Sequence, residues 1–157
     1  MDTVYREILT KIGWLTLTQC GESLTALSFG QRGAGETLPV TPLMREAEKQ
    51  LTAYLDGRLR RFDLPLSPSG TAFRLRCWAA LMQIPYGETW SYSRQASFIG
   101  RPKAVRAVGQ ANHHNPLPIL IPCHRVVGQN GSLTGYAGGL EIKRQLLDLE
   151  SKAVCGG

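Results

Sequence analysis

The sequence lacks several features that would place it in common functional classes. No apolar run approaches the ~20 residues that a membrane-spanning helix needs, and the first residues lack the apolar core of a signal peptide. We therefore expect a cytoplasmic protein with no membrane partner. Its cysteines, Cys20, Cys77, Cys123 and Cys155, form no Cys-x-x-Cys pair, and no histidine precedes His113. This pattern predicts four free thiols, with neither a disulfide framework nor a zinc site.

Acidic residues are absent from one long stretch, between Thr89 and Leu140. Residues 67–157 contain ten Lys/Arg and four Asp/Glu, whereas residues 1–66 contain eight of each, so the net charge of +6 lies in the second half. A field of one sign attracts a polyanion and raises its local concentration. The charge pattern favours a nucleic-acid partner, although a solubility bias with no partner would produce the same excess.

The first part of the chain has the pattern of a small α+β domain. Residues 5–9, 14–18 and 24–29 are rich in β-branched and aromatic side chains and predict a three-stranded antiparallel meander. Thr41 is typical of an N-cap with Pro42 at the first helical position, and apolar residues then recur at helical spacing until Gly57. The turn-rich stretch 64–70 and the change in charge predict a boundary that gives domains of residues 1–66 and 67–157.

The second part is predicted to be mostly helical. Apolar residues at spacings of three and four predict a helix over residues 71–82. A second helix is expected over 91–99 with Ser91 as its cap, and a third from Lys103 to about Asn112 after Pro102. Two short helices joined by Gly100 and Arg101 are typical of a helix-turn-helix, although such a pair is also a common packing unit without nucleic acid.

The third of these helices has a narrow cationic side. At 100° per residue, Lys103, Arg106 and Gln110 share one face of it. Its small residues would allow close approach to another backbone or to a shallow groove; they are Ala104, Ala107, Gly109 and Ala111. Close packing against a neighbouring helix would explain the small residues equally well.

The stretch 115–127 places Cys123 beside His124 at the end of a proline-rich apolar run. Prolines fix φ and remove backbone donors, so we expect a stiff, extended, buried connector. Burial raises the pKa of a thiol, whereas the neighbouring imidazole and the guanidinium of Arg125 would lower it. The alternative is an inert core cysteine followed by a surface histidine.

Several motifs flank this cysteine in order. They are Arg106-Ala107-Val108-Gly109, Asn115-Pro116, Pro122-Cys123-His124-Arg125-Val126 and Gly135-Tyr136-Ala137-Gly138-Gly139-Leu140. From about Thr71 to Glu150 the chain resembles the O6-alkylguanine-DNA alkyltransferases, also called methylated-DNA–protein-cysteine methyltransferases. The resemblance implies an α+β fold with an RNase H-like N-terminal domain, followed by a helical domain with a winged-helix-like helix-turn-helix.

The resemblance also implies an activity, which is direct-reversal DNA repair. An alkyl group of O6-alkylguanine, or less readily of O4-methylthymine, would pass from double-stranded DNA to Cys123 once per molecule, without a cofactor or a metal. The damaged nucleotide would be flipped out of the duplex. The alternative is an alkyltransferase-like protein that binds lesions without transfer, but those proteins carry another residue in place of this cysteine. We expect a monomer; cooperativity on DNA, the preferred adduct size and the organism stay open.

Roles for individual residues follow from the same resemblance. His124 would deprotonate Cys123 through a water while Glu150 orients the imidazole, and Asn115 would tie the Cys123 segment in place. From the residues alone, Glu150 would be a solvated residue at the end of an amphipathic helix over 140–149. Tyr92 would stabilise the departing purine, and backbone carbonyls of Cys123 and Val126 would read the guanine amine.

The remaining roles concern the pocket wall and the DNA. Tyr136 and Ala137 would form the other wall of the pocket, and Ala137 stands where several members have a serine. Arg106 would be inserted into the base stack in place of the flipped nucleotide. The helix with Lys103, Ala104, Ala107, Gly109 and Gln110 would lie in the minor groove.

Overall fold

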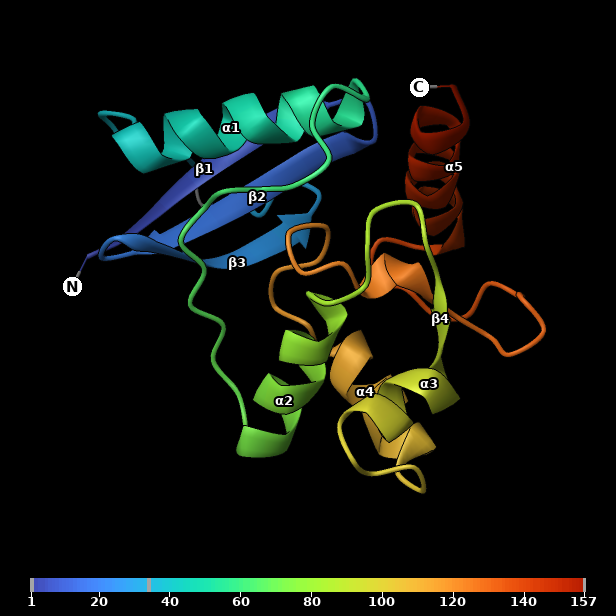
Figure 1. Ribbon diagram of the computed structural model, residues 1–157. Coiled ribbons are helices and arrows are strands. Elements are labelled where there is room, and N and C mark those ends of the chain that lie inside the picture. The colour runs from blue at the N-terminus through green and yellow to red at the C-terminus, as the bar shows by residue number, and fades with distance from the viewer. Residues whose placement is uncertain (1, 34, 157) are drawn as a thin grey trace. The chain divides into compact units, whose positions relative to one another are not determined.

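The computed structural model of the chain describes residues 2–33 and 35–156. The chain divides into two compact units, one up to Ser69 and one from Gly70 onward. Figure 1 shows a sheet and a helix in the first unit and a mainly helical second unit. This division lies a few residues after the predicted boundary between residues 66 and 67, which stays a prediction.

The first unit contains the predicted meander. Strands β1 (Thr3–Thr10), β2 (Gly13–Cys20) and β3 (Ser23–Phe29) pair antiparallel in the order β1-β2-β3. Gly13 adopts a φ of 101°, a conformation that suits glycine and reverses the chain into β2. The small antiparallel sheet of the predicted fold is confirmed.

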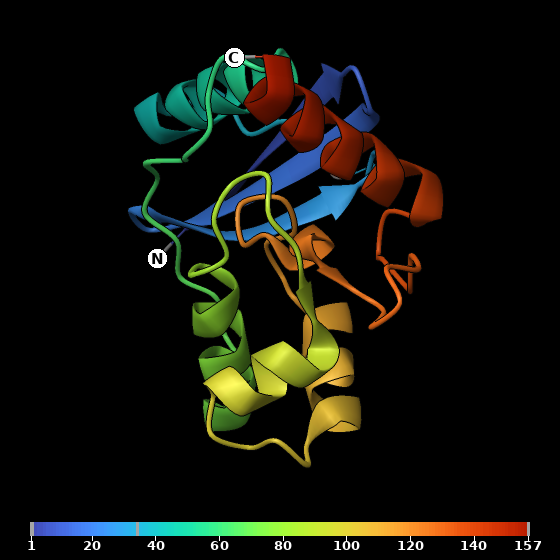
Figure 2. The same cartoon turned by 45° about the vertical axis from the view of Figure 1, so that its right-hand side comes forward.

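Helix α1 (Pro42–Leu55) covers one face of this sheet, as Figures 1 and 2 both show. Thr41 is its N-cap and accepts a hydrogen bond from the backbone N–H of Met44 at 3.1 Å. One stripe of the helix is buried and faces the apolar side chains of the strands. The stripe consists of Met44, Ala47, Leu51, Tyr54 and Leu55. The last four of these residues follow the helical spacing that the sequence predicts, but Met44 is buried in place of the expected Leu43, which is only half-buried.

Three helices form the body of the second unit: α2 (Ala72–Leu81), α3 (Tyr92–Phe98) and α4 (Val105–His113). Helices α2 and α3 both pack against α4. Buried amides join α3 to α4, because Gln95 and Asn112 exchange side-chain hydrogen bonds of 3.0 and 2.7 Å. A fully satisfied buried pair of this kind fixes one relative placement of two helices.

Helix α4 begins later than the sequence predicts. The prediction that it starts with Lys103 is wrong, since the helix begins at Val105 with Ala104 as its N-cap residue. The N–H of Ala104 bonds to the carbonyl of Arg101 at 2.9 Å, and Pro102 occupies the second position of that turn, where its fixed φ is favoured. Lys103 therefore lies in a turn and does not share a helix face with Arg106.

Two short elements complete the second unit. Strands β4 (Trp90–Ser91) and β5 (Val126–Val127) pair parallel, and β5 directly follows a 3₁₀ turn, η1 (Cys123–Arg125). Helix α5 (Leu140–Gly156) extends beyond the predicted range of 140–149 and packs against η1. Within the described residues, no helix is both long enough and apolar enough to span a membrane.

Candidate active site

The segment that leads to Cys123 is buried, as predicted, but it is not extended. It folds back on itself, with the N–H of Ile121 bonded to the carbonyl of Leu117 at 2.8 Å. Ile119 adopts a φ of 75°, which is strained for a β-branched residue and turns the chain. The prolines stiffen this reversal instead of extending the chain.

Asn115 holds both ends of the reversal. Its Oδ1 accepts from the N–H of Leu117 at 2.9 Å, and its Nδ2 donates to the carbonyl of Ile121 at 2.8 Å. Pro122 follows with φ −80° and ψ 65°, the geometry of an inverse γ-turn, and the N–H of Cys123 bonds to the Ile121 carbonyl. The side chain of Asn115 and this turn together fix the start of η1, on which Cys123 lies.

The residues after Cys123 turn inward to α5. Nε2 of His124 lies 2.7 Å from Oε2 of Glu150, and Nε of Arg125 donates to Oε1 of Glu150 at 2.8 Å. The side chains of His124 and Glu150 are 0% and 1% exposed. The reading of His124 as a surface residue and of Glu150 as a solvated helix residue is therefore wrong.

These contacts determine the charge state of the pair. Burial alone would raise the pKa of Glu150, but hydrogen bonds from His124 and Arg125 outweigh it and hold that pKa at about 2. Burial lowers the pKa of His124, against the opposing effect of Glu150. Because an ionised carboxylate only accepts hydrogen bonds, Nε2 of the neutral imidazole is the donor and Nδ1 is its basic nitrogen.

The thiol of Cys123 is protonated in the free protein. Burial raises the pKa of Cys123 to about 11, while a hydrogen bond from Asn115 and the charge of Lys143 act in the opposite direction. Arg125 was expected to lower this pKa, but its guanidinium bonds to Glu150 and to the carbonyl of Ile84 instead. The thiol therefore needs a base when it reacts, and the neutral imidazole next to it in the chain is suited to that task.

Lys143 is a residue of the site that sequence reasoning missed. It is fully buried, and its Nζ donates to the carbonyl of Thr134 at 2.9 Å. Burial lowers the pKa of Lys143 to about 8, and the thiolate form of Cys123 would act against this. A signal was available, because Lys143, Leu146 and Glu150 recur at spacings of three and four and thus share the buried face of α5.

The predicted pocket residues come from three elements of the second unit. Val126 is fully buried in β5. Tyr92 is in the first turn of α3, and its hydroxyl oxygen lies 2.7 Å from Oγ1 of Thr134. Tyr136 is buried, and burial and then the charge of Cys123 raise its pKa. Ala137, next to it, is exposed. Tyr136 thus interacts electrostatically with Cys123, and Tyr92 is hydrogen-bonded to the loop that precedes Tyr136.

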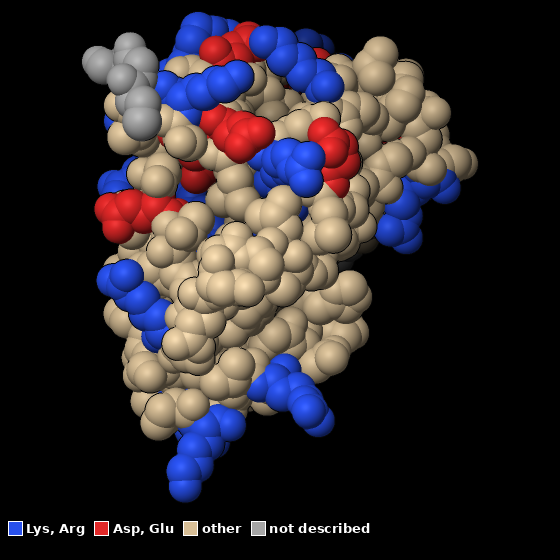
Figure 3. All heavy atoms as spheres, turned by 90° about the vertical axis from the view of Figure 1, so that its right-hand side faces the viewer, with Lys and Arg blue, Asp and Glu red and all other residues tan. Residues whose placement is uncertain are grey.

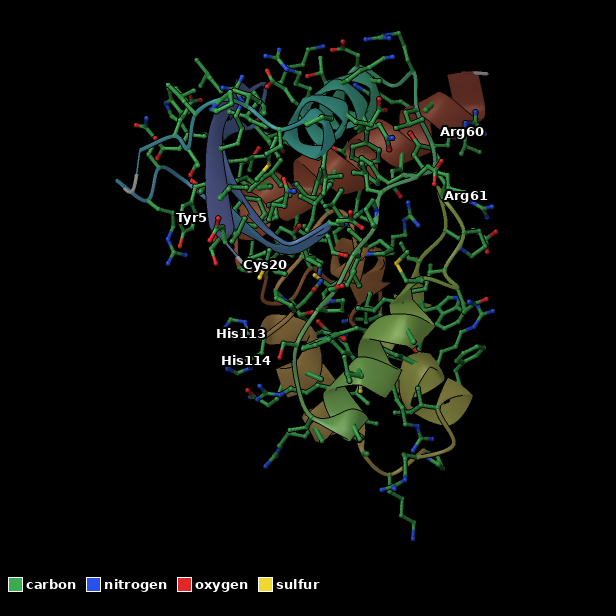
Figure 4. All side chains as sticks on the ribbon, turned by 90° about the vertical axis from the view of Figure 1, so that its left-hand side faces the viewer. Tyr5, Cys20, Arg60, Arg61, His113 and His114 are labelled. Carbon is green, nitrogen blue, oxygen red and sulfur yellow. The ribbon has the colours of Figure 1, made fainter. Side chains whose placement is uncertain are left out.

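The exposed side of α4 carries Arg106, Ala107 and Gln110, and its other side buries Val108, Ala111 and Asn112. The same exposed side ends in His113 and His114, for which the sequence predicts no role and which Figure 4 labels. Gly109 is turned to the ring of Tyr92, since a Cβ there would lie 3.8 Å from Cε1 of that tyrosine. A methyl group at Gly109 would therefore make only an ordinary van der Waals contact with that ring.

Basic side chains also surround the turn between α3 and α4. A hollow of about 410 Å³ is lined by Gly100, Arg101, Pro102, Lys103 and Ala104. Figure 3 shows that the lower part of the face, which α3, α4 and their connection form, carries basic but no acidic side chains. Lys103 thus joins Arg101 at this turn.

The described residues hold no group of three or more His, Cys, Asp or Glu side chains that could bind a metal ion. Cys20, Cys77 and Cys123 are free thiols, and Cys20 is labelled on the sheet of the first unit in Figure 4. The side chain of Cys155 lies outside the described residues.

Both units match models of one protein family. Residues 72–152 match the model for the 6-O-methylguanine DNA methyltransferase DNA binding domain. Residues 3–68 match the model for the ribonuclease-like domain of the same family.

Individual relatives agree with this. The methylated-DNA–protein-cysteine methyltransferase of Mycobacterium tuberculosis H37Rv is 48% identical over 150 residues, which cover 93% of this chain and 91% of the relative. The protein of the same name from Methanosarcina acetivorans is 58% identical over 106 residues, 68% of each chain. The crystal structure of Mycobacterium tuberculosis OGT in complex with DNA has a TM-score of 0.88 at 48% identity, covering 95% of this chain and 93% of that one.

Proposed function

This chain belongs to the 6-O-methylguanine DNA methyltransferase family and is a DNA-repair alkyltransferase, and we propose that it transfers the methyl group of O6-methylguanine in double-stranded DNA to Sγ of Cys123. One observation carries the proposal of Cys123 as acceptor. A buried thiol precedes a buried neutral histidine, and this histidine is fixed by an ionised glutamate at 2.7 Å.

The reaction is a displacement at the methyl carbon. The Cys123 proton passes to Nδ1 of His124 through a water molecule, and the sulfur forms a bond to the methyl carbon. The bond between that carbon and O6 breaks, and its electron pair stays with the purine, which takes up a proton at N1 from water as guanine is regenerated. The imidazolium of His124 returns its extra proton to water. Tyr92 donates a hydrogen bond to the purine ring nitrogen as this negative charge develops. The product on the protein is S-methylcysteine.

Glu150 supports the base in two ways. As a carboxylate it keeps the proton on Nε2 of His124, so that Nδ1 accepts the proton of the thiol. It also stabilises the imidazolium that forms, as an acid does in other nucleophile-histidine-acid arrangements. Arg125 keeps Glu150 ionised through bonds at 2.8 and 3.0 Å.

Lys143 lowers the cost of forming a thiolate in this buried place. It is a fully buried cation whose electrostatic effect opposes the rise in the Cys123 pKa. Asn115 acts in the same direction and fixes the backbone around the sulfur.

DNA binds to the second unit through α4 and the turn before it. The narrow exposed side of α4 suits the minor groove, where small side chains permit close approach. Arg106 is inserted where the nucleotide has left the stack, and Arg101 and Lys103 contact phosphates beside it. Backbone carbonyls of Cys123 and Val126, with Tyr136 and Ala137 opposite, hold the extruded guanine.

The protein acts once because the thioether has no route back to a thiol, and we infer that it acts as a monomer. To test this, the protein is incubated with a duplex that carries one O6-methylguanine, and its intact mass and Cys123 peptide are measured. We expect the mass to rise by one CH₂ group on Cys123, and no change with an unmodified duplex or with Cys123→Ser. Retention of the methylated duplex without a change in mass would instead identify a lesion-binding protein without transfer.

A further inference from the structure

Thr134 connects two parts of the site that are distant in the sequence. It lies in the loop between β5 and α5 and is half-buried. Its Oγ1 lies 2.7 Å from the hydroxyl oxygen of Tyr92, at the start of α3. Its backbone carbonyl accepts from Nζ of Lys143, in α5, at 2.9 Å.

The bond to Lys143 fixes the position of Thr134. Lys143 is fully buried, so its ammonium group must find acceptors inside the protein. A charged donor makes a stronger hydrogen bond than a neutral one. The backbone bonds of this loop lie on either side of Thr134, from Gly128 to Ser132 and from Gly139 to Tyr136. The loop is therefore attached to α5 at the residue that meets Tyr92.

The hydroxyl of Thr134 can serve Tyr92 in two states. A threonine hydroxyl donates one hydrogen bond and accepts others, and the same holds for a phenol. Without substrate, the phenol can donate to Thr134. When Tyr92 donates its hydrogen bond to the purine nitrogen instead, the Thr134 hydroxyl can rotate and donate to the phenol oxygen. This bond stabilises the partial negative charge that develops on the phenol oxygen as Tyr92 donates.

We propose that Thr134 is a positioning residue that holds the Tyr92 hydroxyl in the orientation from which it assists the departing purine, with Lys143 fixing Thr134 in place. This inference rests on the proposed function, in particular on the role of Tyr92. Valine has the shape of threonine but no hydroxyl, and serine has the hydroxyl without the methyl group. Thr134→Val and Thr134→Ser therefore separate the hydrogen bond from the packing.

The test measures the single-turnover rate of methyl transfer from duplex DNA for the wild type and for Thr134→Val, Thr134→Ser, Tyr92→Phe and the Thr134→Val/Tyr92→Phe double variant. Loss of one neutral hydrogen bond corresponds to a rate lower by about three- to tenfold for Thr134→Val. Thr134→Ser should stay within about twofold of the wild type. The double variant should be no slower than Tyr92→Phe, because Thr134 acts through that hydroxyl.

Each contrary result has a distinct meaning. A wild-type rate for Thr134→Val beside a slow Tyr92→Phe would overturn the inference and leave the proposed function intact. A Thr134→Ser variant as slow as Thr134→Val would also overturn the inference. The same holds if adding Thr134→Val to Tyr92→Phe slows transfer as much as it does in the wild type. A wild-type rate for Tyr92→Phe would remove the tyrosine role and the inference with it, and a wild-type protein that gains no methyl group would refute the proposed function itself.

Discussion

Replacing Glu150 with glutamine removes the negative charge that two buried side chains share. The carboxylate accepts from Nε2 of His124 at 2.7 Å and from Nε and Nη2 of Arg125 at 2.8 and 3.0 Å. The side chains of Glu150 and Arg125 are only 1% and 10% exposed. Water therefore cannot solvate the Arg125 guanidinium once its negatively charged partner is lost. In the variant, the guanidinium stays charged because arginine is not deprotonated in proteins.

The expected loss of stability is large. Removing one partner of a buried ion pair costs about 3–5 kcal/mol, because the other charge is left buried and uncompensated. The pKa of Glu150 leads to a similar figure. It falls from 4.5 to about 2 in the folded protein, and such a difference contributes about 3 kcal/mol at neutral pH. We therefore expect the free energy of unfolding of Glu150→Gln to fall by about 3–5 kcal/mol.

The expected loss of activity has a separate cause. The amide of glutamine can donate to Nε2 of His124, which would place the imidazole proton on Nδ1 and remove the base. Loss of a general base lowers a rate by about 10²- to 10⁴-fold. We expect the single-turnover transfer rate to fall within this range.

Urea unfolding and single-turnover transfer measure the two effects, and Glu141→Gln is the matched control. Glu141 is on the same helix but is 71% exposed and lies 4.0 Å from Arg144, so its substitution should change the free energy of unfolding by less than about 0.5 kcal/mol. Adding Arg125→Met to Glu150→Gln should recover part of the stability and none of the activity, since it removes the stranded charge but not the need for the carboxylate. A stability loss below about 1 kcal/mol, which is far less than a broken buried pair costs, or an unchanged transfer rate would refute the reasoning.

Four further predictions concern the same unit. Arg106→Ala should slow repair of duplex DNA more than reaction with the free methylated base, and equal slowing of both would remove its role in nucleotide flipping. Asn115→Ala loses two buried hydrogen bonds from the side chain to backbone groups and should lower the free energy of unfolding by about 2–4 kcal/mol in urea titrations. Lys143→Met removes a charge that lowers the Cys123 pKa, so the alkylation rate of Cys123 by iodoacetamide should rise toward its plateau only at higher pH than in the wild type. The free energy of unfolding, measured in urea titrations at decreasing pH, should fall with acid because folding lowers the pKa values of both His124 and Glu150. The part of this free energy that depends on His124 is lost as the pH falls below 6.5, the pKa of the unfolded state. The part that depends on Glu150 is lost as the pH falls from 4.5 to about 2.

Local signals predicted most of the secondary structure. The N-caps Thr41 and Ser91 were recognisable because a short polar side chain before an apolar periodic run has one favoured task, which is to accept from the N–H three residues on. The three strands of the first unit were equally local, since neighbouring strands joined by tight turns pair with each other.

The start of α4 shows where local signals fail. Proline fits both the first position of a helix and the second position of a turn, and the sequence alone does not decide between them. The carbonyl of Arg101 bonds to the N–H of Ala104, which completes the turn and delays the helix. The two-residue strands β4 and β5 have no period at all, so only the folded chain reveals their pairing.

The candidate site required contacts between distant residues. Cys123 and His124 were evident as neighbours, and the resemblance implied a role for Glu150, but the ion pair of Glu150 with Arg125 depends on how α5 packs against η1. Lys143 was missed because a lysine in an amphipathic helix is usually exposed, and Thr134 because it meets Tyr92 across 42 residues of sequence.

A titration of methyl groups tests the central proposal most directly, namely that the Cys123 thiol accepts one alkyl group permanently. A fixed amount of protein is mixed with increasing amounts of duplex labelled in the O6-methyl group, and the label bound to protein and the repaired duplex are both counted at completion. Both counts should level off at one methyl group for each protein molecule, with all label on Cys123. Repair of several duplexes by each molecule, or repair without label on the protein, would contradict the account.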